Sequence, residues 1–201
     1  PSDDAGGGAE SEPVTVDRDG FLDWLASVDL PKPSDAEREA TENYTEFVYR
    51  KLNAQLRGVD ISDAEGGGYT DELIQQTRRA LDKLIARGAT LDRDLIVYRG
   101  GGRVSDGEFT DPAFVSSTTD EGVALWSFSL GGKKPFAEIR IPAGTKFIAP
   151  DGVLGNNESV EAEIILGRNT RFRFVRRETR AGKYADGREF DYQVDILEVV
   201  R

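Results

Sequence analysis

The sequence contains no cysteine, no histidine and no methionine. Without Cys and His, the chain has no thiol nucleophile, no disulfide, no Cys/His zinc site and no catalytic triad that needs an imidazole base. Any catalysis must therefore run on carboxylates, hydroxyls, Arg and Lys side chains and backbone groups. A protein without cysteine is indifferent to the redox state of its compartment, which suits export. With no Met anywhere and Pro1 first, we expect a mature fragment or an excised domain.

Long hydrophobic runs and an excess of basic residues are also missing. No apolar stretch approaches the length of a membrane span. The 26 Lys and Arg residues stand against 37 Asp and Glu residues, which gives a formal net charge of −11. Nucleic acids and anionic membranes bind basic faces, so we expect neither as a partner. At 201 residues and 38% hydrophobic content, the chain is long enough for one sizeable core.

Residues 1–16 are rich in Gly, Ser and acids and have almost nothing to bury. This composition predicts a disordered linker. Structure is expected to begin near Asp17, with residues 17–201 as a single domain. A first, short helix is predicted within residues 19–30, ahead of Pro31.

Two further helices carry start and stop signals. Ser34 and Glu37 form a capping-box pattern, which predicts a long helix that runs to about Arg57. Its apolar stripe includes Phe47, Val48, Leu52 and Leu56. Thr70 can cap a third helix, whose apolar residues repeat at helical spacing. Gly88 is expected to end this helix.

After this point the periodicity becomes that of strands. The segments are short, β-branched or aromatic, and bounded by Gly, Pro, Asp or Asn. They are residues 95–100, 113–118, 135–141, 145–149, 161–166, 170–175 and 192–200, with one short helix at about 120–128. Helices first and strands afterwards indicate an α+β fold.

Two glutamates stand at the mouth of an apolar run. Glu161 and Glu163 are separated by Ala162, and residues i and i+2 of a strand point to the same face. The two carboxylates are therefore expected side by side, with Ala162 and Ile164 in the core. Taken alone, the pattern also fits two ordinary acids on a solvated strand edge.

Two other strands end in polar residues. Arg99 stands near the end of LIVYRG and is followed by glycines, which let a ligand approach the backbone. Its guanidinium suits a phosphate group. A surface salt bridge beside a turn is the plain alternative. AFVSST ends in hydroxyls, of which Ser116 can orient a neighbouring carboxylate. These hydroxyls also fit an edge strand that leads into a helix cap at Thr119 or Asp120.

An Arg, a Ser and a Glu-x-Glu on successive strands, behind a helical start, together resemble the Arg-Ser-Glu class of mono-ADP-ribosyltransferases, in the branch of the cholera- and binary-toxin-like enzymes. Three longer segments strengthen the resemblance. They are ATENYTEFVYRKLNAQLRG (40–58), FAEIRIPAGTKFIAP (136–150) and EAEIILGRNTRFRF (161–174). The resemblance implies two packed mixed or antiparallel sheets that form an NAD-binding cleft behind the helical part.

The same resemblance implies a reaction and roles for residues. NAD would be cleaved between nicotinamide and ribose, and ADP-ribose would pass to an arginine of a target protein. Glu163 would stabilise the sugar cation, Glu161 would receive the acceptor arginine, and Ser116 would orient Glu163. Further contacts to NAD would come from Arg99, Gly100 and Phe128, with Trp126 as the alternative to Phe128. Tyr44, Tyr49 and Asn53 would add contacts from the long helix. Core packing is the alternative for these tyrosines, since Tyr at helical spacing is usually packed.

Some features depart from the family pattern. The hydroxyl cluster reads Ser-Ser-Thr where the family usually has Ser-Thr-Ser, and the segment 150–159 lacks an aromatic, with Glu158 where one would be expected. The rival readings are an NAD glycohydrolase on the same fold and a binding module without turnover. We expect a monomeric effector, secreted or delivered into a cell, that acts in the cytoplasm. A neutralising immunity protein and a larger parent polypeptide are the further partners to consider.

Overall fold

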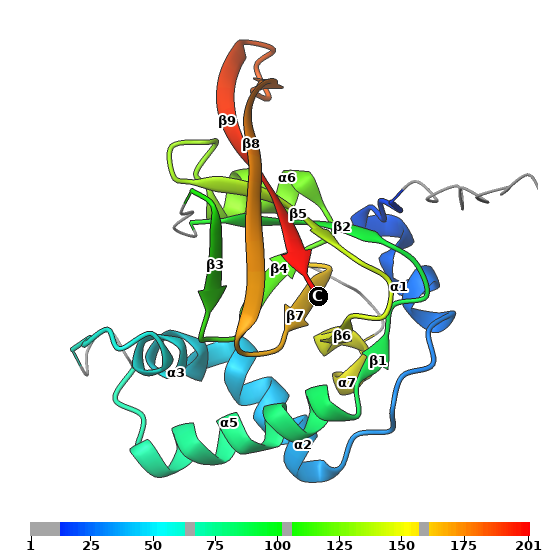
Figure 1. Cartoon of the computed structure of the whole chain (residues 1–201), viewed down its shortest axis with the longest axis vertical. Coiled ribbons are helices and arrows are strands. Elements are labelled where there is room, and N and C mark those ends of the chain that lie inside the picture. Colours follow the sequence, from blue (N-terminus) through cyan, green and yellow to red (C-terminus); the bar gives the residue numbers. More distant parts are fainter. Residues whose placement is uncertain (1–12, 63–66, 102–105, 157–160) are drawn as a thin grey trace, which may run out of the picture.

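The computed structural model describes residues 13–62, 67–101, 106–156 and 161–201. In these residues the helices come first along the chain and most strands follow (Figure 1), which confirms the predicted α+β class. The helical segments are α1 (Arg18–Ala26), α2 (Asp35–Asn43), η1 (Tyr44–Val48), α3 (Tyr49–Leu56), α5 (Asp71–Ala86), α6 (Glu121–Val123), η2 (Ala124–Phe128) and α7 (Pro150–Leu154). The strands are β1 (Ala89–Thr90), β2 (Leu95–Gly100), β3 (Glu108–Asp111), β4 (Val115–Thr118), β5 (Phe136–Ile141), β6 (Lys146–Ile148), β7 (Glu163–Leu166), β8 (Thr170–Lys183) and β9 (Glu189–Val200).

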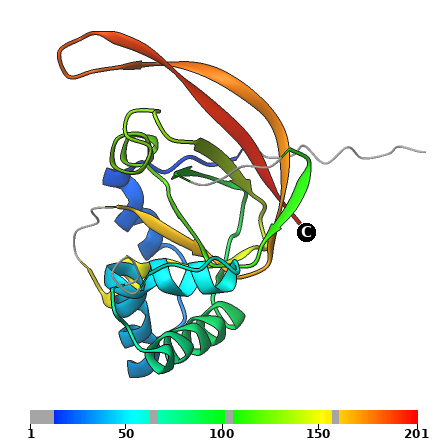
Figure 2. The same ribbon diagram turned by 90° about the vertical axis from the view of Figure 1, so that its left-hand side faces the viewer.

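The strands hydrogen-bond in the order β1-β6-β7-β4-β2-β5-β9-β8-β3, in which β5 and β9 run parallel. The strands form one continuous sheet, because β2 pairs with both β4 and β5. The sheet bends strongly, so that its two halves lie across from each other (Figure 2). Val115 and Leu166 on one half share a buried cluster with Ile139 and Leu197 on the other. The core therefore fills the bend, as it would fill the space between two packed sheets.

The long helix predicted from Ser34 is present, but its middle is not α-helical. Ser34 accepts the Glu37 backbone N–H, and Glu37 accepts the Ser34 N–H at 2.8 Å, which confirms the capping box. Between α2 and α3, η1 is a π-helical segment of five residues. A π turn holds more residues per turn than an α turn, so the faces of the helix shift along it. Tyr44, at the start of η1, is fully buried, and Phe47, expected in the apolar stripe, is 51% exposed.

The helix α5 begins at the predicted N-cap and packs against the helical segment that contains Tyr44. The Thr70 side chain accepts the Leu73 backbone N–H, which makes it the N-cap. The apolar face of α5 includes Leu81 and Leu84, and it joins a second buried cluster that contains Tyr44. This packing fixes the helical segment that carries Tyr44 against the sheet.

The β8–β9 hairpin is longer than the sequence predicts, and its end projects from the body (Figures 1 and 2). β8 has 14 residues and β9 has 12. Its outer part alternates charged residues, so hydrophobicity gives no strand signal there. Two arginines of β8 hold it through short ion pairs, Arg177 with Asp195 and Arg180 with Glu138, each at 2.6 Å. The sequence analysis also missed β1, β3 and α7, which are short.

The folded body begins earlier than predicted. Val14 forms a parallel bridge to Leu95, and Val16 is buried in the main core, although both were expected in the linker. The rest of that segment, residues 1–12, lies outside the described residues. Among the described helices, none is long and apolar enough to cross a lipid bilayer.

Candidate active site

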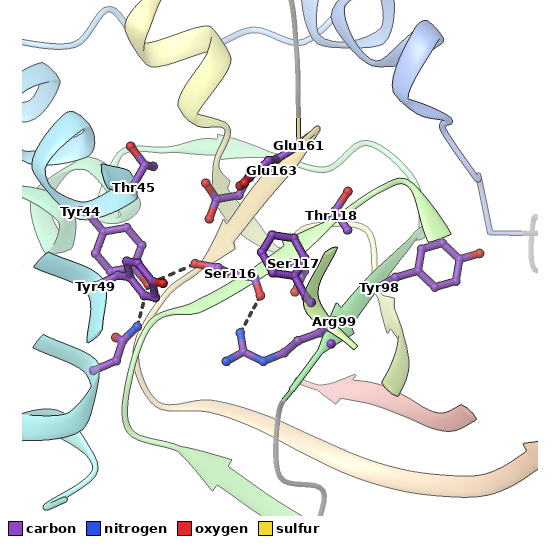
Figure 3. A pocket seen from close by; sticks show the side chains of 13 residues that line it. Tyr44, Thr45, Tyr49, Tyr98, Arg99, Ser116, Ser117, Thr118, Glu161 and Glu163 are labelled. Atoms are coloured by element: carbon purple, nitrogen blue, oxygen red, sulfur yellow. Dashed lines mark hydrogen bonds between the residues drawn. The ribbon is translucent and has the colours of Figure 1, made fainter. Parts of the chain in front are cut away.

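Three neighbouring strands of the sheet carry the predicted chemistry. β7, β4 and β2 are adjacent, and they contribute Glu163, Ser116 and Arg99 to one cavity of about 210 Å³ (Figure 3). Every residue that the sequence assigns to the site lines this cavity: Tyr44, Tyr49, Asn53, Arg99, Gly100, Ser116, Phe128, Glu161 and Glu163. Four lining residues were not predicted, namely Thr45, Tyr98, Ser117 and Thr118. Of these, Ser117 and Thr118 belong to the hydroxyl cluster, whereas Tyr98 and Thr45 gave no sequence signal.

The two glutamates reach the cavity by a different geometry from the one predicted. β7 begins at Glu163, so Glu161 precedes the strand and the i, i+2 rule does not apply to it. Ala162 has φ 47°, in the left-handed region that few non-glycine residues adopt, and its side chain is fully buried. The Ala162 carbonyl accepts the Thr119 backbone N–H at 3.1 Å, which ties this turn to the end of β4. The turn, rather than a strand face, therefore sets the position of Glu161.

Burial dominates the electrostatics of Glu163. It raises the pKa of this carboxyl from 4.5 to about 7, because the charged form loses its hydration. A hydrogen bond from Ser116 opposes this rise, while the negative charge of Glu161 adds to it. Burial also raises the pKa of Glu161, with a contribution from Asp151. Both carboxyls therefore hold a proton more readily than a glutamate of ordinary pKa does, although Glu161 is exposed and Glu163 is half-buried.

A chain of hydrogen bonds leads from the helical layer to Glu163. The Asn53 side-chain amide donates to the Tyr44 hydroxyl at 2.9 Å, and this hydroxyl lies 3.2 Å from the Ser116 Oγ. A hydroxyl has one proton, so if Ser116 directs its proton at Glu163, Tyr44 is the donor to Ser116. Tyr44 thus lines the cavity and also connects Asn53 to Ser116, and its contact with NAD stays a prediction.

Asn53 has a free acceptor. Its Oδ1 atom is buried and has no hydrogen-bond partner among the described residues. Buried polar atoms without a partner are rare and call for an explanation. A polar group of a ligand in this cavity would supply the missing bond.

Arg99 is a half-buried cation without a carboxylate partner in the described part of the chain. Its Nη1 donates to the Ser116 backbone carbonyl at 2.5 Å. Burial lowers its pKa, and the positive charge of Arg57 adds to this effect. Arg57 itself is held by Asp111 at 2.8 and 3.0 Å. An anion in the cavity would compensate the charge of Arg99, and a guanidinium suits a phosphate group.

The wall around Gly100 is closely packed. A Cβ at this glycine would lie 2.6 Å from the backbone of Phe128 and of Ser129, so no other residue fits without a backbone shift. Phe128 lines the cavity and is 40% exposed. Trp126, its competitor, instead packs on the hairpin rings of Tyr184 and Phe190, at centroid distances of 5.7 and 5.4 Å. Of these two aromatics, Phe128 lines the cavity and Trp126 does not.

The segment before the glutamates is only partly described. Residues 150–154 form α7, which starts with Pro at its first position. Glu158, where an aromatic would be expected, lies outside the described residues.

The comparisons with known proteins agree with this site. The family model of the ADP-ribosyltransferase exoenzymes matches residues 22–189. Among the curated proteins compared, none matches the chain. Solved structures show the same fold at low identity. Exoenzyme S from Pseudomonas aeruginosa, in complex with human 14-3-3 protein beta and bound to carba-NAD, is 20% identical, with a TM-score of 0.59 over 91% of this chain and 81% of that chain.

Two further structures have similar scores. The C3 exoenzyme of Clostridium limosum is 14% identical, with a TM-score of 0.64 over 92% of this chain and 96% of that chain. The ADP-ribosyltransferase Vis in complex with agmatine is 19% identical, with a TM-score of 0.61 over 92% of this chain and 83% of that chain. The family match covers most of the chain, and the ordered Arg, Ser and Glu-x-Glu residues lie in one cavity. The chain therefore belongs to the ADP-ribosyltransferase exoenzyme family, in its Arg-Ser-Glu class.

Proposed function

We propose that the protein transfers ADP-ribose from NAD to an arginine side chain of a target protein and releases nicotinamide. NAD is the substrate that the family uses. The observation that carries the proposal is the pair of glutamates in one cavity with Arg99 and Ser116. One carboxylate can stabilise the positive charge that develops on the sugar, and the other can bind the guanidinium of the acceptor.

The first step breaks the bond between the ribose C1′ and the nicotinamide nitrogen. Nicotinamide leaves as a neutral group with the electron pair, and C1′ becomes oxocarbenium-like, as in glycoside hydrolysis. In its ionised form, Glu163 stabilises this positive charge electrostatically, from a position where burial reduces its own hydration. The leaving group needs no proton, so the absence of histidine is no obstacle. Arg99 would hold the phosphates, and Phe128 would stack on the nicotinamide.

In the second step a guanidinium nitrogen of the acceptor forms the bond to C1′ and loses a proton. An arginine guanidinium is a poor nucleophile, because it is protonated at any ordinary pH. Glu161 can pair with it, orient it and accept the proton. The raised pKa of Glu161 suits a proton acceptor better than that of an exposed glutamate. The Vis structure with agmatine, a guanidinium compound, supports an acceptor of this class.

The likeness to bacterial exoenzymes and toxins also supports a delivered or secreted effector that modifies a protein inside a target cell. The target, and any partner that neutralises the enzyme, would be found by the same labelling experiment in a cell lysate. Mass spectrometry of the modified peptides would identify the acceptor residue.

The test follows ADP-ribose from labelled NAD, with agmatine as a small acceptor. We expect the parent enzyme to give ADP-ribosyl-agmatine. Glu161→Gln should keep the cleavage of NAD but lose transfer, and Glu163→Gln should lose both. Glu189→Gln, an exposed acid on β9, is the matched control and should behave as the parent. Free ADP-ribose as the main product of the parent would identify a glycohydrolase and refute the transfer.

A further inference from the structure

A second, larger cavity adjoins the active site. It encloses about 480 Å³ and shares Tyr98 with the first cavity. Its lining is Thr15, Val16, Asp17, Gly20, Tyr98, Thr119, Asp120, Glu121 and Gly122. The lining thus holds three acids and no basic residue, unlike the active site, where Arg99 faces the glutamates.

The second cavity lies close to the acceptor side of the active site. Thr118 lines the first cavity and Thr119, the next residue, lines the second. The Thr119 backbone N–H binds the carbonyl of Ala162, the residue between the two glutamates. The second cavity therefore borders the end of β4, which is bonded to the turn that carries Glu161.

A tyrosine on the wall of this cavity has a hydroxyl without a partner among the described residues. Tyr98 is 8% exposed, and its hydroxyl makes no hydrogen bond to any residue that the structure describes. Figure 3 shows this hydroxyl pointing away from Arg99 and Ser116, the opposite direction from the NAD side of the site. Burial, followed by the charge of Glu121, raises its pKa to about 12, so it stays neutral. The oxygen of a neutral phenol can accept a hydrogen bond from a cation.

The acids of the cavity are fixed in place, and most of their charge is uncompensated. Asp17 accepts the Gly20 N–H at 2.8 Å and Asp120 accepts the Val123 N–H at 2.9 Å, as helix N-caps. These bonds hold the carboxylates still without neutralising them. Glu121 differs, because Arg180 pairs with it at 2.9 Å.

The chemistry of the cavity favours an organic cation over a metal ion. In the described residues no group of three or more Asp or Glu side chains is placed to hold a metal. A guanidinium is wide and planar and has five N–H donors, so it can bridge carboxylates that are too far apart for one small ion.

We propose that this cavity binds a second basic side chain of the acceptor protein, close in sequence to the arginine that is modified. The inference rests on the proposed function and defines its substrate class further: an arginine flanked by another basic residue. Asp17 and Asp120 supply the charge, and Tyr98 supplies a hydrogen-bond acceptor. The NAD side of the site takes no part in this recognition.

The experiment uses two sets of peptides, each with one acceptor arginine. In one set a lysine lies one, two or three residues from the arginine, and in the other a glutamine replaces that lysine. Lysine adds a cation without adding a second guanidinium acceptor. The enzyme variant is Asp17→Asn with Asp120→Asn, because asparagine also caps helices and removes only the charge. The matched control variant carries Asp23→Asn and Asp29→Asn, two acids of the same N-terminal region outside this cavity.

The measurements are kcat/KM for transfer and, independently of turnover, peptide affinity by fluorescence anisotropy. We expect the parent to prefer the best lysine peptide by about tenfold, as for a charge-assisted bond. The double variant should lose this preference and keep its activity on agmatine. An equal affinity for both peptide sets, or a preference that survives in the double variant, would overturn the inference. Preferential binding without any transfer would instead refute the proposed function and leave the cavity assignment standing.

Discussion

Replacing Glu163 with Gln should abolish activity and, at the same time, stabilise the fold. Burial raises the pKa of Glu163 from 4.5 to about 7, so the native state carries a cost for holding this group ionised. The cost starts as the pH rises above 4.5, grows up to about pH 7 and is constant beyond. At about 1.4 kcal/mol for each pKa unit, it amounts to roughly 3 kcal/mol. Glutamine has nearly the same shape and no charge, so the variant avoids this cost.

The stability difference should therefore depend on pH in a defined way. At pH 8 we expect the unfolding free energy of Glu163→Gln to exceed that of the parent by about 2 to 3 kcal/mol. For a domain of this size the melting temperature should rise by about 5 to 10 °C. At pH 4.5 the difference should nearly vanish, because the parent carboxyl is then protonated. Urea unfolding at both pH values measures it, with Glu189→Gln as the exposed control.

Activity supplies the second half of the same test. Nicotinamide release by the variant should fall by about 100-fold or more, the usual cost of losing an electrostatic stabiliser of the transition state. In the parent, kcat/KM for NAD should decline below an apparent pKa near 7. An equal stability gain at both pH values, or none at pH 8, would refute the reasoning that burial of the charge governs this residue.

Three other variants test the surroundings. Tyr44→Phe keeps the buried ring and removes its hydroxyl, so kcat should fall about tenfold with little change in KM for NAD, and the apparent pKa of the pH–rate profile should rise. Gly100→Ala forces a methyl onto the Phe128 backbone, and it should lower the unfolding free energy by about 1 to 3 kcal/mol in denaturant titration. Hydrogen bonding to Arg87 lowers the pKa of Glu37 to about 2, so its stabilisation is present above pH 4.5 and lost as the pH falls toward 2. Glu37→Gln should remove about 1 kcal/mol at pH 7, because solvent screens part of this pair, and much less at pH 2, where about half of the native Glu37 carboxyls are protonated.

The sequence predicted most elements because local signals and burial agree there. Strand β2 was predicted at its observed bounds, since LIVYRG is a continuous apolar run that ends in Arg and Gly. The outer half of the β8–β9 hairpin was missed because ion pairs, rather than an apolar face, hold it. The π segment was missed because no local pattern marks it, and Phe47, which was expected in the apolar stripe, is exposed.

The residues of the candidate site divide in the same way, into those with a local sequence signal and those that only the fold places. Arg99, Ser116 and Glu163 were found because each ends or begins a strand in a recognisable pattern. The position of Glu161 was predicted for the wrong reason, since it depends on the left-handed backbone of Ala162, which no propensity indicates. Tyr98 was missed because an alternating strand position reads as core. Its hydroxyl becomes a candidate binding group only because Asp17 and Asp120, at the starts of α1 and α6, line the same cavity.

The π-helical segment has a consequence for the tolerated length of the chain. An α-helix turns by about 100° and advances by about 1.5 Å for each residue. If all the residues from Tyr44 to Val48 wound as ordinary α-helix instead, α3 would turn around its axis by about that angle, because the π segment holds about one residue more than an α segment of the same rotation. Asn53 and Tyr49 would then point away from the NAD pocket, although neither had been changed. An active relative that is one residue shorter in this stretch should therefore have a plain α-helix here and keep the groups that match Asn53 and Tyr49 at the pocket.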